Sequence, residues 1–221
     1  MYTLSIDTTA AACSIALHQD EKCIDCFEQS MDFGQAEVLM PEIDNILKKH
    51  NLTIKDLSLL VVCVGPGSFT GVRSSISAAR AFGIACPSLE VMGISSFEGY
   101  VQSLIWQPEQ ISQVNAVIIE TKREDFYFQL FDNKLKAIAQ PSVGFRDDII
   151  SMLQNQKVTF IGDGVERFLS SPTGLSIHAI LNSKHLDVKD IASSGIKLYH
   201  KKEHKYPKPM YLRAPDVCVK S

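Results

Sequence analysis

The residues from Gly65 to Arg73 combine glycines, hydroxyls and one cation in the pattern G-P-G-S-F-T-G-V-R. An apolar run, 59–64, precedes them, and a helix-like run, 74–85, follows them. A strand, a glycine-rich turn and a helix start together can bind phosphate, because the free N–H groups of the first helical turn point outward. The same arrangement also allows close packing, since glycine has no Cβ. The run has neither the lysine of a Walker A loop nor GxGxxG spacing, so both interpretations stay open.

A second candidate for phosphate chemistry is Asp7-Thr8-Thr9, at the end of the first strand pattern. Asp7 could orient a water molecule or Mg²⁺, and the threonine hydroxyls could meet phosphate oxygens. The alternative is a turn in which these side chains bond to local backbone groups. The following residues, 10–12, are alanines, so we do not expect the chain to hydrolyse a nucleotide by itself. The candidate nucleotide contacts are Asp7, Thr8, Thr9, Gly65 and Gly67.

Two shorter motifs match metal-binding spacings. Cys23 and Cys26 have CxxC spacing within a strand pattern, where positions three apart point to opposite faces. No second pair completes a tetrahedral site, so we expect buried strand thiols. Residues 200–204, H-K-K-E-H, match the H-x-x-E-H pattern of some zinc peptidases. Lysines surround this motif and Pro207 follows it, which indicates the solvated end of a helix. We expect no metal site.

The composition is that of an ordinary globular protein. The chain has 221 residues, of which 45% are hydrophobic and 21% charged, and its formal net charge is −3. A negative net charge disfavours a stand-alone nucleic-acid binder. No run approaches the roughly 20 apolar residues of a membrane span, and the first residues indicate a strand rather than a signal peptide. We therefore expect a cytoplasmic protein whose six cysteines are reduced.

Hydrophobic periodicity divides the chain into two similar halves. The first half has the pattern of three strands, a helix, a strand, the glycine loop, a second helix, a short strand and a linking helix. Their expected ranges are 2–7, 13–18, 22–28, 35–50, 59–64, 74–85, 88–92 and 95–106. The second half repeats this order more weakly. Its strands are expected at 114–121, 126–131, 135–139 and 158–161, and its helices at 145–153, 165–170 and 188–200.

Two β-β-β-α-β-α units in one chain predict an α/β protein of the actin-like ATPase superfamily (ribonuclease H-like), with duplicated subdomains. We expect residues 1–106 to form the N-terminal subdomain, which contains the glycine loop, and residues 107–221 to form the C-terminal one. Prolines restrain the segment 206–209, so this segment is expected to be extended. The tail that contains it is expected to pack back on the first subdomain.

Segments along nearly the whole chain resemble the TsaB (YeaZ) family of bacterial proteins. Residues 65–73 match the hallmark of that family in full. Residues 4–17, with I-D-T-T and A-C-S-I-A-L, resemble its opening hairpin. Residues 92–96, M-G-I-S-S, resemble its entry to the next helix, and residues 209–213, P-M-Y-L-R, resemble its terminal segment. The chain departs from the family pattern at Ala11, Gln35, Val64 and 120–123.

The resemblance implies a non-catalytic role. Members of the family are partners of TsaD, which transfers a threonylcarbamoyl group to adenosine 37 of tRNAs that read ANN codons. TsaD has two metal-binding histidines in the order H-x-x-x-H, whereas the matching segment here has Ser96 and Tyr100 in their places. Neither side chain offers the imidazole nitrogen that such a metal site uses. The chain is therefore expected to bind and activate TsaD without catalysing the transfer itself.

The same resemblance implies further partners. TsaD is expected to form a heterodimer with the chain, TsaE to join the complex, and TsaC to supply the threonylcarbamoyl donor. Without TsaD, a homodimer could form through the same face, because a face of small residues is self-complementary about a two-fold axis. No intrinsic cofactor is expected, although ATP or ADP could bind within the complex. We expect tRNA contact only within the complex; the lysine cluster at 197–208 is either such a contact or a solvated helix end.

The helix after the glycine loop has one apolar face and one face of small residues. The apolar face, which includes Val72, Ile76, Ala79 and Phe82, is expected to pack on the sheet. The small residues let another helix approach closely, and that helix belongs either to TsaD or to the chain's own segment 35–50. With the family resemblance, we favour a partner interface. Its residues are Glu37, Pro41, Ser68, Phe69, Thr70, Arg73, Ser74, Ser77, Ala78 and Ala81.

Two other classes of function stay open on the sequence. The expected fold also suits an autonomous ATP-dependent phosphotransferase, although fold is weak evidence for function. ATP turnover that is lost on Asp7→Ala would support this class. A metallopeptidase is the second alternative, because TsaD relatives once carried that label. Ser96 and Tyr100 argue against it, and stoichiometric zinc in the purified protein would support it.

Overall fold

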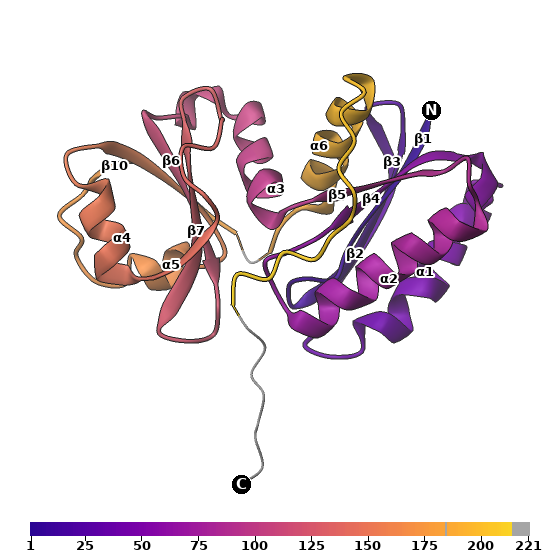
Figure 1. The fold of residues 1–221 in the computed structure, drawn as a ribbon, viewed down its shortest axis with the longest axis horizontal. Helices are drawn as coiled ribbons and strands as arrows, with labels where there is room; N and C mark the ends of the chain where they lie inside the picture. Colours follow the sequence, from indigo (N-terminus) through magenta and orange to yellow (C-terminus); the bar gives the residue numbers. More distant parts are fainter. Residues whose placement is uncertain (184, 214–221) are drawn as a thin grey trace, which may run out of the picture.

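The protein is built from two five-stranded mixed sheets with two helices between them (Figure 1). The computed structural model describes residues 1–183 and 185–213. Each sheet receives its strands from one half of the sequence, and the two sheets have the same strand order. The predicted α/β fold with a duplicated βββαβα unit is therefore confirmed.

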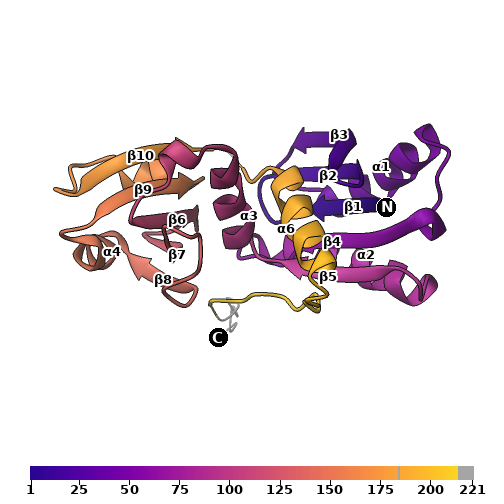
Figure 2. The ribbon, with the colours of Figure 1, turned by 90° about the horizontal axis from the view of Figure 1, so that it is seen from above.

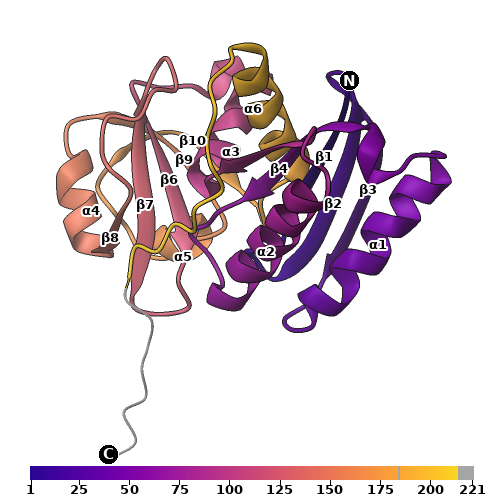
Figure 3. The same ribbon diagram turned by 45° about the vertical axis from the view of Figure 1, so that its right-hand side comes forward.

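The first sheet contains β1 to β5 in the order β3-β2-β1-β4-β5, with β1, β2 and β3 antiparallel and β1, β4 and β5 parallel. Its central strands are buried along nearly their whole length because helices cover both faces. The helices α1 and α2 lie side by side on one face (Figure 3). The bounds are β1 Tyr2–Asp7, β2 Ala12–Gln19, β3 Lys22–Ser30, α1 Gln35–Lys49, β4 Leu57–Cys63, α2 Phe69–Ala85 and β5 Glu90–Ile94.

The second sheet repeats this arrangement in the order β8-β7-β6-β9-β10. Its helices are much shorter than their counterparts: α4 has 8 residues against 15 in α1, and α5 has 4 against 17 in α2. The bounds are β6 Val114–Glu120, β7 Asp125–Asp132, β8 Ser142–Phe145, α4 Arg146–Leu153, β9 Lys157–Gly162, α5 Val165–Phe168 and β10 Ser176–Asn182.

The last helix of each half lies between the sheets (Figure 2). α3 (Ser96–Ser103) contacts strands of the second sheet, whereas α6 (Val188–His200) contacts strands of the first. A shared core of buried apolar side chains, among them Val61, Phe97, Tyr100, Ile119 and Ile191, joins both sheets to these helices. The halves thus exchange their last helices. Whether residues 1–106 and 107–221 form separate subdomains, as predicted, stays a prediction.

The second half differs from the prediction in two of its strands, one of them wrongly placed and one not predicted. Residues 135–139 form a turn rather than a strand, because the Asp132 carboxylate accepts the backbone N–H groups of Lys134 and Lys136, and Leu135 has a φ of 59°. The third strand of the second sheet is instead β8. The sequence also gave no sign of β10, an edge strand with a register shift between Ile177 and Ala179.

Candidate functional site

The glycine loop after β4 packs backbone to backbone against the β1–β2 hairpin. The Ser68 N–H donates to the Thr9 carbonyl at 2.7 Å, and the Thr8 hydroxyl donates to the Gly71 carbonyl at 2.6 Å. A Cβ at Gly67 would overlap the Thr9 backbone, and a Cβ at Gly71 would overlap the Thr8 carbonyl oxygen. The glycines are therefore required by this close approach. Ser68 also accepts from the Gly71 N–H at 3.3 Å, so α2 begins at Phe69, five residues before the predicted start.

The candidate nucleotide contacts form part of this packed junction. Asp7 is 4% exposed, and its Oδ1 accepts the Thr9 N–H at 2.7 Å. Burial raises the pKa of the Asp7 carboxyl, with hydrogen bonds from Thr9 and Cys63 acting against this effect. The local backbone bonds predicted as the alternative are thus present. A nucleotide role for Asp7, Thr8, Thr9, Gly65 and Gly67 stays a prediction.

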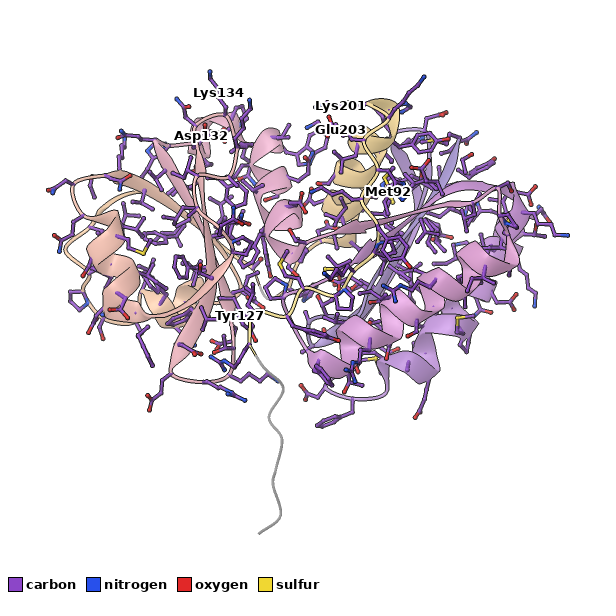
Figure 4. The ribbon with its side chains drawn as sticks, viewed as in Figure 1. Met92, Tyr127, Asp132, Lys134, Lys201 and Glu203 are labelled. Carbon is purple, nitrogen blue, oxygen red and sulfur yellow. The ribbon has the colours of Figure 1, made fainter. Side chains whose placement is uncertain are left out.

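A cleft of about 710 Å³ lies between the two halves. It is lined on one side by the glycine loop and the first hairpin, and on the other by the β6–β7 hairpin and by Tyr127 of β7, which Figure 4 labels. Asp163, which follows β9, lies in this lining. Burial raises the pKa of its carboxyl to about 7, and the nearby Glu120 and Asp7 carboxylates act in the same direction. The cleft therefore has a carboxyl group that changes its charge near neutral pH.

Ser96 and Tyr100 also line the cleft, in the first turns of α3. The Ser96 hydroxyl donates to the Pro66 carbonyl at 2.9 Å, and Tyr100 is buried. Both side chains thus hold α3 against the glycine loop and the second sheet. Within residues 1–183 and 185–213, no three His, Cys, Asp or Glu side chains are grouped so that they could hold a metal ion.

A groove of about 550 Å³ runs between α1 and α2 on the outer face of the first sheet. Six predicted interface residues line it together with Ala36, Leu39 and Met40 of α1: Phe69, Thr70, Arg73, Ser74, Ser77 and Ala78. Ala81 is exposed one turn further along α2. Glu37 and Pro41 are exposed on α1 outside the groove lining, and Ser68 is the N-cap of α2.

The residues of α2 that face the sheet are the four predicted from helical periodicity, although one of them is only half-buried. Val72, Ile76 and Ala79 are buried in the core under the helix, and Phe82 is half-buried against it. Ala78 is also half-buried against this core, which α1 shares. The small face of α2 is therefore divided: Ala78 packs toward the chain's own α1, as the alternative predicted, while Ser77 and Ala81 are open to solvent.

Several exposed side chains near the cleft and on the helices α1 and α2 were not found from the sequence. Phe33 is 88% exposed before α1, Met40 is 46% exposed on α1, and Ile84 is 82% exposed on α2. Arg73 lies over the Phe69 ring at 3.8 Å and donates to the Tyr211 hydroxyl at 3.0 Å, although Tyr211 is distant in the sequence. A break in helical periodicity marks Met40 and Ile84, but no sequence signal pairs Arg73 with Tyr211.

The two metal-like motifs have local structural roles. α6 ends at His200, Lys202 has a φ of 59°, and His204 Nδ1 lies 3.0 Å from Glu90 Oε1, so the H-x-x-E-H residues do not share one helix. This agrees with the predicted helix end. The expectation of buried thiols in β3 was wrong: Cys26 is exposed and Cys23 is only half-buried, because β3 is the edge strand of its sheet.

These duplicated mixed sheets, with helices exchanged between the halves, define a protein of the actin-like ATPase fold class. A protein of unknown function from Bacteroides thetaiotaomicron, described as having an actin-like ATPase fold, has a TM-score of 0.50 at 7% identity over 89% of this chain and 95% of that one. YeaZ from Pseudomonas aeruginosa has a TM-score of 0.80 at 19% identity over 96% and 99% of the two chains.

Sequence comparison defines the family. A model described as TsaD, tRNA N6-adenosine threonylcarbamoyltransferase, matches residues 34–218. A relative from Buchnera aphidicola, named tRNA threonylcarbamoyladenosine biosynthesis protein TsaB, is 27% identical over 222 residues, covering 95% of this chain and 96% of its own. The chain belongs to the TsaD family and, within it, to the TsaB (YeaZ) branch, as predicted.

Among the helices that the structure describes, none is long and apolar enough to cross a membrane.

Proposed function

We propose that the chain takes part in tRNA threonylcarbamoyladenosine biosynthesis as a non-catalytic subunit that docks on TsaD and activates it. In this role it supports transfer of the threonylcarbamoyl group to adenosine 37 of tRNAs that read ANN codons. The observation that carries the proposal is the groove between α1 and α2, in a chain whose relatives are named for this pathway.

The groove has the properties of a helix-docking surface. Its floor is made of small side chains such as Ser74, Ser77 and Ala78, which let a partner helix approach closely. Exposed apolar side chains, Met40 and Phe69, stand at its edges. An exposed apolar patch with polar residues around it is typical of a protein interaction site. A paralogue with the same two helices would offer a matching surface, which supports TsaD as the partner.

Two observations support a non-catalytic role. Ser96 and Tyr100 occupy the positions at which the resemblance places metal-binding histidines, and both are engaged in packing within the chain. The Asp7 hairpin is held by its own backbone and by the glycine loop. We include in the proposal that TsaE joins the complex, that ATP or ADP binds only there, and that tRNA is contacted only there. A homodimer through the same groove is the form expected without TsaD, and the cytoplasm is the expected location.

The decisive experiment is reconstituted threonylcarbamoyl transfer to tRNA with TsaD, TsaE and TsaC, with and without this chain. We expect modification only when the chain is present, and no transfer or ATP turnover by the chain alone. Equal modification without the chain would contradict the proposal. ATP turnover by the pure chain that is lost on Asp7→Ala would establish an enzyme instead.

The docking surface has its own test. Ala81→Glu places a charge on the exposed small face of α2, and Ala78→Arg places a long charged side chain in the groove itself. Both should abolish TsaD binding in a pull-down while the monomer stays folded. Ala137→Glu, at an exposed alanine of the β7–β8 loop, is the matched control and should bind normally. If Ala81→Glu and Ala78→Arg both bind as well as this control, the groove is not the interface.

A further inference from the structure

The extended segment 204–213, here called the strap, passes from the outer edge of the first sheet toward the second sheet (Figures 1 and 3). Within the described residues, it follows α6 and has no regular secondary structure of its own. It nevertheless has directional contacts along its length, to β5, to α2 and to β7.

The strap is fixed to the first sheet by backbone hydrogen bonds. The Gly93 N–H of β5 donates to the Lys205 carbonyl at 2.8 Å, and the Met210 N–H donates to the Val64 carbonyl at 2.8 Å. A Cβ at Gly93 would lie 2.9 Å from Pro207 Cα, so β5 has a glycine where the strap crosses it. Lys205 also forms an ion pair with Glu98 of α3.

Two arginines of α2, seven residues apart, hold two tyrosines of the strap. Arg80 donates to the Pro207 carbonyl at 2.6 Å and lies over the Tyr206 ring at 5.1 Å. Arg73 donates to the Tyr211 hydroxyl at 3.0 Å, and the Tyr211 ring lies 5.3 Å from that of Phe69. Since Phe69 and Arg73 also line the α1–α2 groove, this end of the strap and the groove share residues.

The far end of the strap is bound to the second sheet. Arg213 forms an ion pair with Asp125 at the start of β7. Asp125 is itself fixed, because the Thr121 hydroxyl donates to its Oδ1 at 2.9 Å and Arg167 donates to its carbonyl at 2.9 Å. Between these anchors, Leu212 packs on the core that joins the two sheets, and Met210 packs on that core and on the one beneath α1 and α2.

We infer that the strap is a relay: occupation of the α1–α2 groove is transmitted through Phe69, Arg73 and Tyr211 to Arg213, and so to the position of the second sheet relative to the first. The partner side of this inference rests on the proposed function. A helix seated in the groove restricts Phe69 and Arg73, and through them the Tyr211 anchor. Because coupling between two sites is reciprocal, release of the Arg213 anchor must weaken binding in the groove.

The first test uses the full chain and a variant outside the groove. Arg213→Ala should speed hydrogen exchange at the Met210 amide by about tenfold or more, because the segment opens more often. It should also weaken TsaD binding by about fivefold, at the lower end of known couplings. Arg146→Ala is the matched control: it removes an arginine that bonds to carbonyls of 168–172 within the second half only. Unchanged exchange and affinity in Arg213→Ala would overturn the relay.

A charge exchange separates the ion pair from general damage. Asp125→Arg combined with Arg213→Asp should return both readouts toward those of the original chain, whereas a merely structural loss would not recover. If Asp125→Arg does not fold, Tyr211→Phe gives a milder perturbation, since it removes only the hydroxyl that Arg73 contacts. This variant should still speed exchange in the hairpin at residues 121–125, and unchanged exchange there would overturn the relay.

Failure of the proposed function can be told apart from failure of the relay. If the original chain does not bind TsaD, the proposed function fails, and the relay is then judged by exchange in the free chain. Faster exchange at residues 121–125 on Tyr211→Phe would support the relay even then. Exchange that stays at the original rate would overturn it.

Discussion

The two halves build the same junction, a hairpin resting on the start of a helix, but the second half adds an ion pair to the close glycine contacts that both halves have. In the first half the β1–β2 hairpin meets α2 through backbone contacts that only glycine allows, at Gly67 and Gly71. In the second half Gly162 and Gly164 also approach the β6 backbone closely, and the β6–β7 hairpin is in addition joined to α5 by charges. Arg167 donates to both Glu120 oxygens at 2.7 and 2.8 Å, and Asp163 accepts the Glu120 N–H at 3.0 Å. One topology therefore does not dictate one set of stabilising forces.

The halves also differ in the surface that they present. The long pair α1 and α2 leaves a groove with exposed apolar edges, whereas α4 and α5 are too short to form a comparable pair. The sheets are alike in strand order, so the difference comes from the helices. Helix length therefore decides which half has a groove on its outer face.

The largest expected effect tests the glycine junction. Gly71→Ala should destabilise the fold by about 3 kcal/mol, because the new Cβ overlaps the Thr8 carbonyl oxygen and the core cannot make room freely. That loss corresponds to a fall in Tm of roughly 10 °C for a chain of this size, measured by thermal unfolding. Alanine normally stabilises a helix relative to glycine, so a loss of stability in Gly71→Ala would by itself show that the steric overlap outweighs helix propensity.

Gly174→Ala is the control for this substitution, since nothing lies within 4 Å of its Cβ position and its φ is 68°. Only backbone strain of about 1 kcal/mol is expected there. Equal losses at Gly71 and Gly174 would show that the close approach of the hairpin does not limit stability.

The second prediction concerns Asp163, which follows β9 as Gly65 and Pro66 follow β4. Burial raises the pKa of its carboxyl from 3.8 to about 7. The folded state therefore binds the proton more tightly than the unfolded state, and stability falls as the pH rises from about 4 to about 7. Asp163→Asn should remove this loss and stabilise the protein on the order of 2 kcal/mol at pH 8, with little gain at pH 4.

Thermal unfolding of Asp163→Asn across this pH range gives the measurement. Asp147→Asn, at an exposed carboxylate of α4, is the matched control. A difference between Asp163→Asn and the original chain that is the same at pH 4 and pH 8 would refute the raised pKa.

Most of the first sheet could be predicted from the sequence because its central strands are buried on both faces and are mainly apolar, with alternation in β1 and a nearly continuous apolar run in β4. The second half is less regular. The segment 135–139 has strand-like composition, but the Asp132 side chain bonds to the backbone at 134 and 136 and closes a turn there (Figure 4). β10 is an edge strand with a register shift, so its alternation is broken. A local sequence pattern cannot show that a side chain, rather than a neighbouring strand, will accept the backbone N–H groups of a segment.

The candidate site likewise has a part that could be predicted from the sequence and a part that could not. Phe69 to Ala78 could be predicted because the glycine motif and the small-residue spacing lie within one short stretch. The contact between Arg73 and Tyr211 joins residues far apart in the chain, and only the path of the strap brings them together. The pKa of Asp163 depends on burial in the cleft and on Glu120 and Asp7, which the chain places around it by folding.

The third prediction compares the outer helices of the two halves. Met40 on α1 and Met152 on α4 are exposed to similar extents, 46% and 50%. In the proposed complex, Met40→Arg should weaken TsaD binding at least tenfold, about 1.4 kcal/mol, because a charge then lies at the apolar edge of the groove. Met152→Arg should leave the affinity unchanged. Titration calorimetry measures both, and equal affinities for the two variants would remove the functional contrast between the halves.

The smallest effect tests the charged junction of the second half. Burial acts to raise the pKa of Glu120, but hydrogen bonds and the charge of Arg167 outweigh it, so this pKa lies below 4.5. The ion pair therefore stabilises the fold above the unfolded-state pKa, and this contribution is lost as the pH falls through the lower folded-state value. Arg167→Met should cost about 1 kcal/mol at pH 7, since the pair is partly exposed, and progressively less below pH 4.5.

Arg146→Met is the control in the same half, because Arg146 bonds mainly to carbonyl groups that do not titrate. Its cost should change less with pH and with added salt than the cost at Arg167, because Asp147, the carboxylate neighbour of Arg146 at 3.5 Å, is almost fully open to solvent. If the cost of Arg167→Met is independent of both pH and salt, then van der Waals packing of Arg167 on the Phe126 ring, 3.8 Å away, holds the hairpin. In that case the two halves rely on packing alike, and the contrast between a glycine junction and a charged junction is lost.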